Sequence, residues 1–351
     1  MGFEFWRAYN MHMVYFNGFI NSTTRDFDFE KWEGYETEAL NRYAFQFIDQ
    51  CGDEPFALFL SPHQPHGTPF DYAPERYYAR LPERLELPPN VPERMRGLKG
   101  ERQNPWSSYR NYLAMTLALD DMLGELLDRL EARGKAANTI VVFTSDHGTQ
   151  GGSQGIPFWT KKRPYEESLR VPCVARWPGF LEGGARRDFL HAPVDFFPTL
   201  CGLCGTPIPR TVEGRDLSAA WLGRPGAGEQ ESVFCMNFGS QHDWYDDGDE
   251  WRGVRTKTRQ FTRWLDGREE LFDLANDPLQ TRNLAGEPAW REEQAALERM
   301  LAEHQARRGD TLAPCSSYRA WVDSQRRPIR NAFGPLSDPE GEPDWSLLYP
   351  A

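Results

Sequence analysis

The run of residues 139–144, Thr-Ile-Val-Val-Phe-Thr, constrains the fold more than any other segment. It contains only β-branched and aromatic residues without polar alternation, which is typical of a strand buried on both faces of a parallel sheet. The run stops at Ser145, and Asp146, His147 and Gly148 follow. Ligands of open α/β sheets bind beside the carboxyl ends of strands. Asp146 and His147 are therefore candidate metal ligands, although an Asp that caps the turn and a packed His is the simpler interpretation.

Two further apolar runs and two helical patterns surround this strand. Residues 55–60, Pro-Phe-Ala-Leu-Phe-Leu, are predicted to form a second strand, and a third is expected to end at Trp177. Apolar residues at helical spacing predict a helix over 35–50 and a long one from Asn104-Pro105 to Gly134. Helix followed by buried strand, twice over, predicts an α/β fold whose mixed, mostly parallel sheet is sandwiched by helices.

The pattern changes at about Ser232. Short alternating strands separated by Asp-Gly turns predict an antiparallel sheet, and a helix is expected at about 288–307. The tail from 309 onward is rich in Pro, Gly and charge. We therefore predict a partial α/β core over 1–231 and a C-terminal subdomain with antiparallel sheet, helix and tail over 232–351.

Composition excludes several classes of protein. The 351 residues carry a formal net charge of -12, which argues against nucleic acid as the main partner. Six cysteines are too few to define a disulfide framework, and we interpret Cys201 and Cys204 as structural. No apolar stretch reaches the roughly 18–20 residues of a membrane span. The sequence shows no signal peptide, and the native compartment stays open.

The candidate chemistry is that of an oxyanion site. Lys161 follows Asp146 and His147 in the same connection, and His63 and His66 follow the predicted strand 55–60. We expect both strand ends to meet in one pocket beside Lys161, where a metal ion, an ammonium and an imidazolium would hold the oxygens of an anion. Carboxylate ligands favour Ca²⁺ or Mg²⁺, whereas an imidazole ligand favours Zn²⁺ or Mn²⁺.

Four segments, in this order, resemble the sulfatases of the alkaline phosphatase superfamily. They are PFALFLSPHQPHGTPF at 55–70, TIVVFTSDHG at 139–148, WTKKRPYEESLRVPCVARWPG at 159–179, and the segment 254–285, which contains ELFDL. The resemblance implies sulfate ester hydrolysis with a divalent metal and an alkaline phosphatase-like fold that is incomplete at its N-terminus. Hydrolysis of phosphate or phosphonate esters, or a non-catalytic remnant, are the alternatives.

The resemblance also implies roles for individual residues. Asp146 and His147 would bind the metal, normally Ca²⁺, while Lys161 and His66 would be the catalytic residues that contact the sulfate. His63 would support substrate binding, and Lys162 would be solvated. A loop containing His242 and Trp244 is a candidate surface for a sugar ring, although a solvated loop is the simpler interpretation.

One expected motif does not occur. The family's formylglycine nucleophile derives from Cys/Ser-x-Pro-x-Arg, and Cys204 stands in the different spacing Cys-x-x-Pro-x-x-Arg. The family's Asp-Asp metal ligands and a further Lys and His would lie in a segment before Met1. We therefore expect an amino-terminally truncated chain that is inactive alone, with the missing segment or a second copy as partner and a small-molecule or carbohydrate sulfate ester as substrate. Family members are often periplasmic, secreted or lysosomal.

Overall fold

The computed structural model describes residues 3–9, 12–22, 29–68, 70–100, 104–239, 247–324, 329–331 and 334–335. The chain divides into two compact units, which we describe separately. The first comprises Met1–Phe143, Thr149–Thr160 and Val174–Gly179, and the second comprises Thr144–Gly148, Lys161–Cys173 and Phe180–Ala351. Within the described residues, no helix has both the length and the apolar character that a membrane crossing requires.

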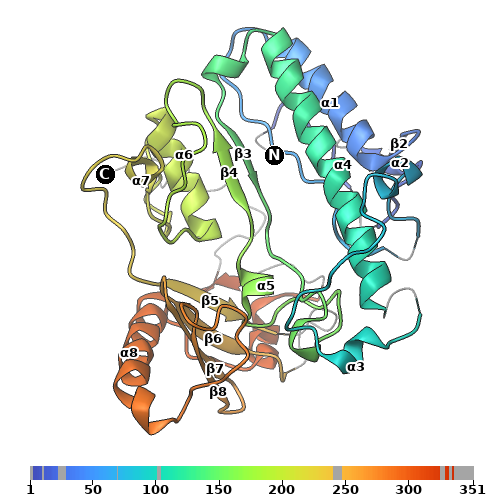
Figure 1. Cartoon of the computed structure of the whole chain (residues 1–351). Coiled ribbons are helices and arrows are strands. Elements are labelled where there is room, and N and C mark those ends of the chain that lie inside the picture. The colour runs from blue at the N-terminus through green and yellow to red at the C-terminus, as the bar shows by residue number, and fades with distance from the viewer. Residues whose placement is uncertain are drawn as a thin grey trace. The chain divides into compact units, whose positions relative to one another are not determined.

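Two helices form the frame of the first unit. Helix α1 (Glu36–Gln50) lies along helix α4 (Pro105–Ala132), as Figure 1 shows. Asn104 caps α4, because its side-chain oxygen accepts hydrogen bonds from the backbone N–H groups of Trp106 and Ser107 at 2.9 and 3.2 Å. Proline at the next position costs the helix nothing, since the first N–H groups have no partner inside the helix. Both predicted helices are confirmed.

A core of small and aromatic residues joins these helices. Ala114, Met115 and Ala118 of α4 are fully buried against Tyr15 and Tyr35. Small side chains on α4 let the tyrosine rings approach its backbone closely, which gives the dense packing of a protein interior. The remaining elements of the unit are short: β1 (Phe19–Asn21), β2 (Phe29–Lys31), α2 (Glu75–Tyr78), α3 (Glu93–Arg96), and the 3-10 turns Ala136–Asn138 and Ser153–Gly155.

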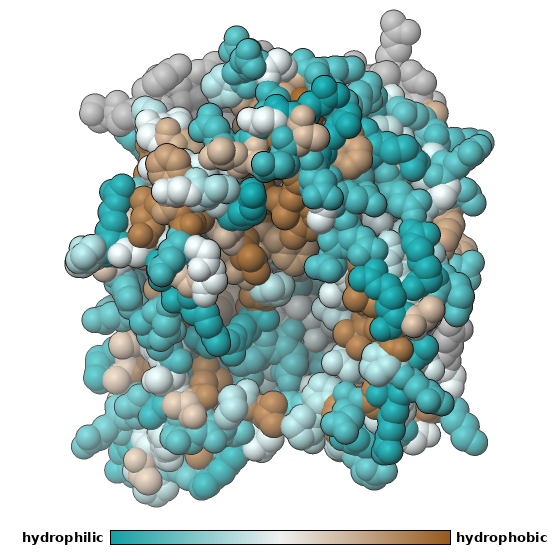
Figure 2. Space-filling model, turned by 45° about the horizontal axis from the view of Figure 1, so that its top comes forward, coloured by the Kyte–Doolittle hydropathy of each residue, from teal (hydrophilic) through white to brown (hydrophobic). Residues whose placement is uncertain are grey.

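The predicted central strands form less sheet than expected. Strand β3 (Val141–Thr144) pairs with β4 (Cys173–Arg176) in a two-stranded sheet. Residues 55–60 form no strand, because no neighbouring segment among the described residues supplies a ladder. The prediction that these segments are buried on both faces is therefore wrong here: Phe59 is 69% exposed and Val174 is 61% exposed. Figure 2 shows apolar side chains gathered on one face of the surface.

The second unit is built on the predicted antiparallel sheet. Strands β5 (Val233–Asn237), β6 (Trp251–Arg255), β7 (Arg259–Trp264) and β8 (Glu269–Asp273) pair in sequence order (Figure 1). Helix α8 (Arg291–Arg308) packs on the sheet, as predicted, after a 3-10 turn at Pro288–Trp290.

One row of side chains across the sheet explains why α8 packs there. Val254 lies opposite Phe261, which lies opposite Leu271, so the three share one face. Leu297 and Leu301, one helical turn apart on α8, cover this row, and all five residues are almost fully buried. The alternation of the strands and the spacing along α8 therefore match across the interface.

Shorter elements complete the second unit. They are α5 (Glu166–Leu169), α6 (Phe196–Cys204), α7 (Ser218–Trp221), the 3-10 turns Pro193–Asp195 and Cys315–Trp321, and strands β9 (Arg330–Asn331) and β10 (Gly334–Pro335). The tail begins packed rather than loose, because the buried Cys315 donates its N–H to Glu250 at 2.7 Å. The sheet begins at Val233, next to the predicted domain boundary, which itself stays a prediction.

Candidate active site

The turn after β3 holds Asp146 and His147. One Asp146 oxygen accepts the N–H of His147 at 2.8 Å, and the other lies 3.3 Å from the Nε2 atom of His147. Gly148 donates its N–H to the carbonyl of Ser168 at 2.9 Å. A Cβ atom on Gly148 would lie 1.9 Å from the carbonyl oxygen of Glu167. Only glycine therefore lets this turn pack against helix α5.

Both candidate metal ligands are accessible. The Asp146 side chain is 81% exposed and that of His147 is 42% exposed, which fits ligands open to a bound ion. The described residues contain no group of three or more His, Cys, Asp or Glu side chains able to hold a metal ion. Calcium takes roughly six to eight oxygen ligands and zinc four. Asp146 and His147 therefore fit a metal site only as part of its ligand set.

A consecutive aspartate pair on α4 does not extend this set. Asp121 forms an exposed ion pair with Arg80 at 2.7 Å on the first unit. Asp120 is its exposed neighbour on the same helix. Because Asp121 already pairs with Arg80, we assign Asp120 and Asp121 to the solvated surface of the helix.

Lys161 lies in the same unit as the Asp146 turn. Burial lowers the pKa of Lys161, and the charge of Asp146 opposes that shift. No residue in the described ranges forms a hydrogen bond or ion pair with its ammonium group. A half-buried, unpaired ammonium beside a carboxylate is suited to bind an anion, because partial burial weakens the competition from water.

Lys162 is held in a different way from its neighbour. Its Nζ atom pairs with Asp249 at 3.2 Å, and its carbonyl accepts the indole N–H of Trp251 at 2.7 Å. Its φ of 65° also places the backbone in the left-handed region. The prediction that Lys162 is solvated is therefore wrong, because the sheet supplies partners that the sequence did not reveal. Of the two lysines, Lys161 is the one left available.

The segment that follows these lysines is fastened to the antiparallel sheet. Glu166 accepts two hydrogen bonds from the guanidinium of Arg255, at 2.8 and 2.9 Å. Tyr165 donates its hydroxyl to Glu270 at 3.0 Å, and Gln280 accepts the N–H of Glu166 at 2.7 Å. A buried structural pair was expected for Glu166, but sequence analysis missed its partner Arg255 and the contacts of Glu270 and Gln280. The one indication in the sequence was that Glu270 and Gln280 lie within the segment 254–285, which resembles the family.

The two histidines of the first unit have different partners. The Nδ1 atom of His63 lies 2.8 Å from an oxygen of Glu36, which sequence analysis also missed. The Nδ1 atom of His66 lies 2.6 Å from the carbonyl of the next residue, Gly67. Tyr15 donates its hydroxyl to the carbonyl of His66 at 2.7 Å. The structure therefore places His63 and His66 together and Asp146, His147 and Lys161 together, and the meeting of both groups stays a prediction.

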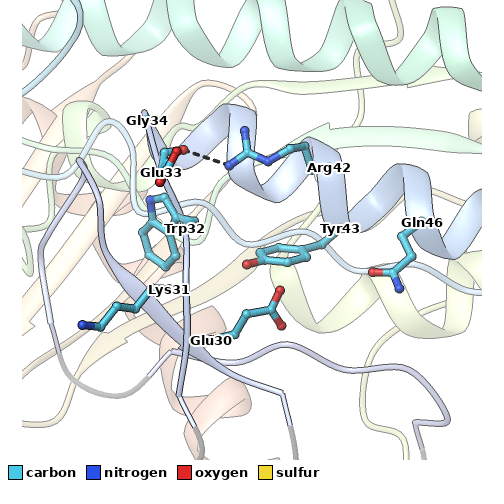
Figure 3. Close-up of a pocket in the computed structure, with 8 residues that line it drawn as sticks. All are labelled: Glu30, Lys31, Trp32, Glu33, Gly34, Arg42, Tyr43 and Gln46. Atoms are coloured by element: carbon cyan, nitrogen blue, oxygen red, sulfur yellow. Dashed lines mark hydrogen bonds between the residues drawn. The ribbon is translucent and has the colours of Figure 1, made fainter.

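Two predicted residues fall outside the described part of the chain, and one pocket contains none of the predicted residues. His242 and Trp244 fall outside the described residues. A cavity of about 670 Å³ lies in the first unit between β2 and α1 (Figure 3). Its lining contains none of the predicted site residues and consists of Glu30, Lys31, Trp32, Glu33, Gly34, Arg42, Tyr43 and Gln46. The candidate catalytic and metal-binding residues therefore do not line this cavity.

Comparison with known families identifies the class of this protein. Residues 2–206 match the family model described as Sulfatase. Residues 155–307 match the one described as N-sulphoglucosamine sulphohydrolase, C-terminal. The chain belongs to the sulfatase family, as its sequence motifs predicted.

Curated relatives share this family. An ulvan-active sulfatase of Formosa agariphila is 31% identical over 88% of this chain and 59% of its own length. An endo-4-O-sulfatase of Bacteroides thetaiotaomicron is 28% identical over 81% of this chain and 58% of its own length. An N-acetylglucosamine-6-O-sulfatase of the same species is 29% identical over 59% of this chain and 38% of its own length. The chain thus spans less than two thirds of each of these relatives.

Solved structures confirm the predicted fold class. BT4656, solved in complex with its substrate D-glucosamine-2-N,6-O-disulfate, aligns with a TM-score of 0.74 and 21% identity over 87% of this chain and 76% of that chain. The yidJ protein of Bacteroides fragilis aligns with a TM-score of 0.75 and 26% identity over 89% of this chain and 67% of that chain. The alkaline phosphatase-like α/β fold with a C-terminal antiparallel sheet is therefore established.

Proposed function

We propose that this chain takes part in the hydrolysis of sulfate esters of carbohydrates. Membership of the sulfatase family supports the reaction class, and relatives named for ulvan and N-acetylglucosamine support a sugar substrate. The observation that carries the proposal is the half-buried ammonium of Lys161, which has no partner among the described residues and lies close to the exposed Asp146. This arrangement offers one positive charge to an anionic group, as a sulfate requires.

We assign the following roles within this proposal. Lys161 binds a sulfate oxygen and neutralises charge that builds up there during S–O cleavage. His66 contacts the sulfate or its leaving oxygen, and His63 supports substrate binding. Asp146 and His147 contribute two ligands to a divalent cation, for which Ca²⁺ is the first choice and Mg²⁺, Mn²⁺ or Zn²⁺ are alternatives. When bound, such an ion polarises a sulfate oxygen.

We further propose that the chain alone has negligible turnover. The sequence contains no Cys/Ser-x-Pro-x-Arg motif from which a formylglycine nucleophile could form. A companion segment or partner would then supply the nucleophile and the remaining metal ligands. Turnover of an aryl sulfate by the purified chain, lost in Asp146→Ala, would contradict this part of the proposal. Turnover of a phosphonate ester instead would support the alternative hydrolase.

A binding experiment tests the sulfate-binding role directly. We would titrate the purified chain with D-glucosamine 6-sulfate by calorimetry in the presence of Ca²⁺. A hydrogen bond to a charged group contributes about 1.5–3 kcal/mol, so Lys161→Ala should raise the Kd by roughly 10- to 100-fold. Lys99→Ala, at an exposed position of the first unit, is the matched control and should leave the Kd unchanged. Equal affinities of the wild type and Lys161→Ala, or no binding by the wild type, would refute the role.

A further inference from the structure

Glu36 is a carboxylate enclosed in the interior of the first unit. Its side chain has no exposed surface, and it lies in the first turn of helix α1, where the helix dipole favours negative charge. Its oxygens accept hydrogen bonds from the N–H of His63 at 3.3 Å and from the side-chain amide of Gln64 at 3.1 Å. The third partner is the His63 ring at 2.8 Å. In the described ranges no Lys or Arg pairs with Glu36.

The phenols around Glu36 cannot balance its charge. Burial, followed by the nearby Glu36 carboxylate, raises the pKa of Tyr9 and of Tyr15 well above the ordinary value of a phenol. Burial also raises the pKa of Tyr35, which precedes Glu36 in the chain. All three side chains therefore stay neutral at physiological pH. Among the described residues in contact with Glu36, His63 is the one that can carry a positive charge.

The His63 ring is held so that one nitrogen remains available. The ring of Tyr9 packs on it with centroids 4.3 Å apart, and the rings of His12 and Tyr15 lie 5.8 and 6.1 Å away. With Nδ1 bound to Glu36, Nε2 has no hydrogen-bond partner within the described part of the chain. The His63 side chain also keeps 17% of its surface exposed. A carboxylate that holds one ring nitrogen fixes the tautomer and presents the other nitrogen.

The neighbouring His12 has partners of a different kind, and His66 has a different partner on Nδ1. His12 uses both nitrogens, because Nδ1 accepts the N–H of Val14 at 3.3 Å and Nε2 donates to the carbonyl of Phe19 at 2.7 Å. That pattern fits a neutral ring, which does not repel a protonated His63. The Nδ1 atom of His66 meets a backbone carbonyl instead of a carboxylate. A carbonyl orients an imidazole but does not compensate its positive charge as a carboxylate does.

We propose that Glu36 is a positioning residue that keeps a proton on Nδ1 of His63 and directs Nε2 of His63, which donates when the ring is fully protonated, to an oxygen of the bound sulfate ester. The substrate in this statement rests on the proposed function. Glu36 acts only through the imidazole and does not touch the ester.

Histidine tautomers give the most direct test. Two-dimensional ¹⁵N spectra of the full chain distinguish a ring protonated on Nδ1 from one protonated on Nε2. We expect the His63 resonance, assigned by its loss in His63→Gln, to show the Nδ1–H form as its main neutral species. In Glu36→Leu this form should become the minority, whereas Glu38→Gln should leave it unchanged. Glu38 lies on the same helix but pairs with the exposed Arg76, so it is the matched control.

A second measurement needs no variant. Diethyl pyrocarbonate acylates accessible imidazole nitrogens, and tandem mass spectrometry locates each modified histidine in the native chain. We expect His63 to be modified faster than His12, whose two nitrogens are both engaged. An Nε2–H tautomer of His63, or a His63 that reacts no faster than His12, would overturn the proposal.

A protection experiment tests the proposed contact between His63 and the substrate separately. D-glucosamine 6-sulfate should protect His63 from acylation and leave the rate at His12 unchanged. Absence of protection, while Lys161→Ala still weakens binding of the same sugar, would refute the contact of His63 with the ester and leave the proposed reaction class and the sulfate-binding role of Lys161 intact. Absence of both effects would instead refute the proposed function.

Discussion

Gly148 is the residue at which a single methyl group should disturb the Asp146 turn most. Its backbone φ lies outside the left-handed region, so alanine is conformationally allowed there. Space is the only obstacle: the new Cβ would lie 1.9 Å from the carbonyl oxygen of Glu167 and 3.0 Å from its carbonyl carbon. Both are backbone atoms, which cannot rotate away as a flexible side chain would. The turn and helix α5 must therefore separate.

The cost follows from two contributions. Separation breaks the 2.9 Å hydrogen bond from the Gly148 N–H to Ser168, and such a bond contributes about 0.5–1.5 kcal/mol. Overpacking of a tight contact costs about 1–3 kcal/mol. We therefore expect Gly148→Ala to lower the free energy of unfolding by about 2–4 kcal/mol. For a unit of this size that corresponds to a fall in Tm on the order of 10 °C.

Urea unfolding followed by circular dichroism and fluorescence measures this loss. Gly183→Ala is the matched control, because Gly183 has an ordinary φ and nothing lies within 4 Å of an added Cβ. It should change the free energy of unfolding by less than about 0.5 kcal/mol. If Gly148→Ala were as stable as Gly183→Ala, the contact between the turn and α5 could not exist as described.

Three further predictions concern charges in the second unit. Arg252→Met should lower the free energy of unfolding by about 3–5 kcal/mol, because it leaves Asp310 without the buried partner that it contacts at 2.8 Å. Arg268, whose side chain is 58% exposed in its ion pair, provides the control. In the same urea titration, Arg268→Met should lower the free energy of unfolding by less than about 1 kcal/mol. Burial and nearby arginines lower the pKa of His304 from 6.5 to about 4, so the unfolded chain binds the proton first as pH falls. Between pH 6.5 and about pH 4 the free energy of unfolding should drop by on the order of 2–3 kcal/mol. If His304→Gln showed the full drop in urea titrations across this range, the assignment to His304 would be contradicted. Burial lowers the pKa of Lys161 below 10.5, so the folded chain releases that proton before the unfolded chain does. The free energy of unfolding should therefore rise as pH increases through the folded pKa towards 10.5. Lys161→Met should remove this rise in melting experiments at alkaline pH.

Local patterns in the sequence predicted the elements whose stability is local or whose partners follow directly in the chain. The long helix from Asn104 to Gly134 carries its own cap and its own apolar stripe, and α4 forms there. Strands β6, β7 and β8 are joined by connections of a few residues, and each of the four antiparallel strands pairs with the next one in the sequence.

Elements that depend on distant partners were harder to predict. The apolar run 55–60 has the composition of a strand, yet a strand exists only where another segment supplies hydrogen bonds. Lys162 looked like a solvated residue because Asp249, its partner, lies far along the chain. Sequence analysis did not single out Glu36, because only the fold brings it within 2.8 Å of His63.

The sequence by itself determined the family, the long helices and the C-terminal sheet, and it named the candidate residues for binding an anion or a metal. These depend on residue type and spacing along one stretch of chain. The tertiary structure decided which of them are available. It paired Lys162 and left Lys161 without a partner in the described part of the chain, it placed Gly148 where no side chain fits, and it gave His63 a buried carboxylate. Burial and hydrogen-bond partners set the charge and orientation of a side chain, and both arise only when segments far apart in the sequence come into contact.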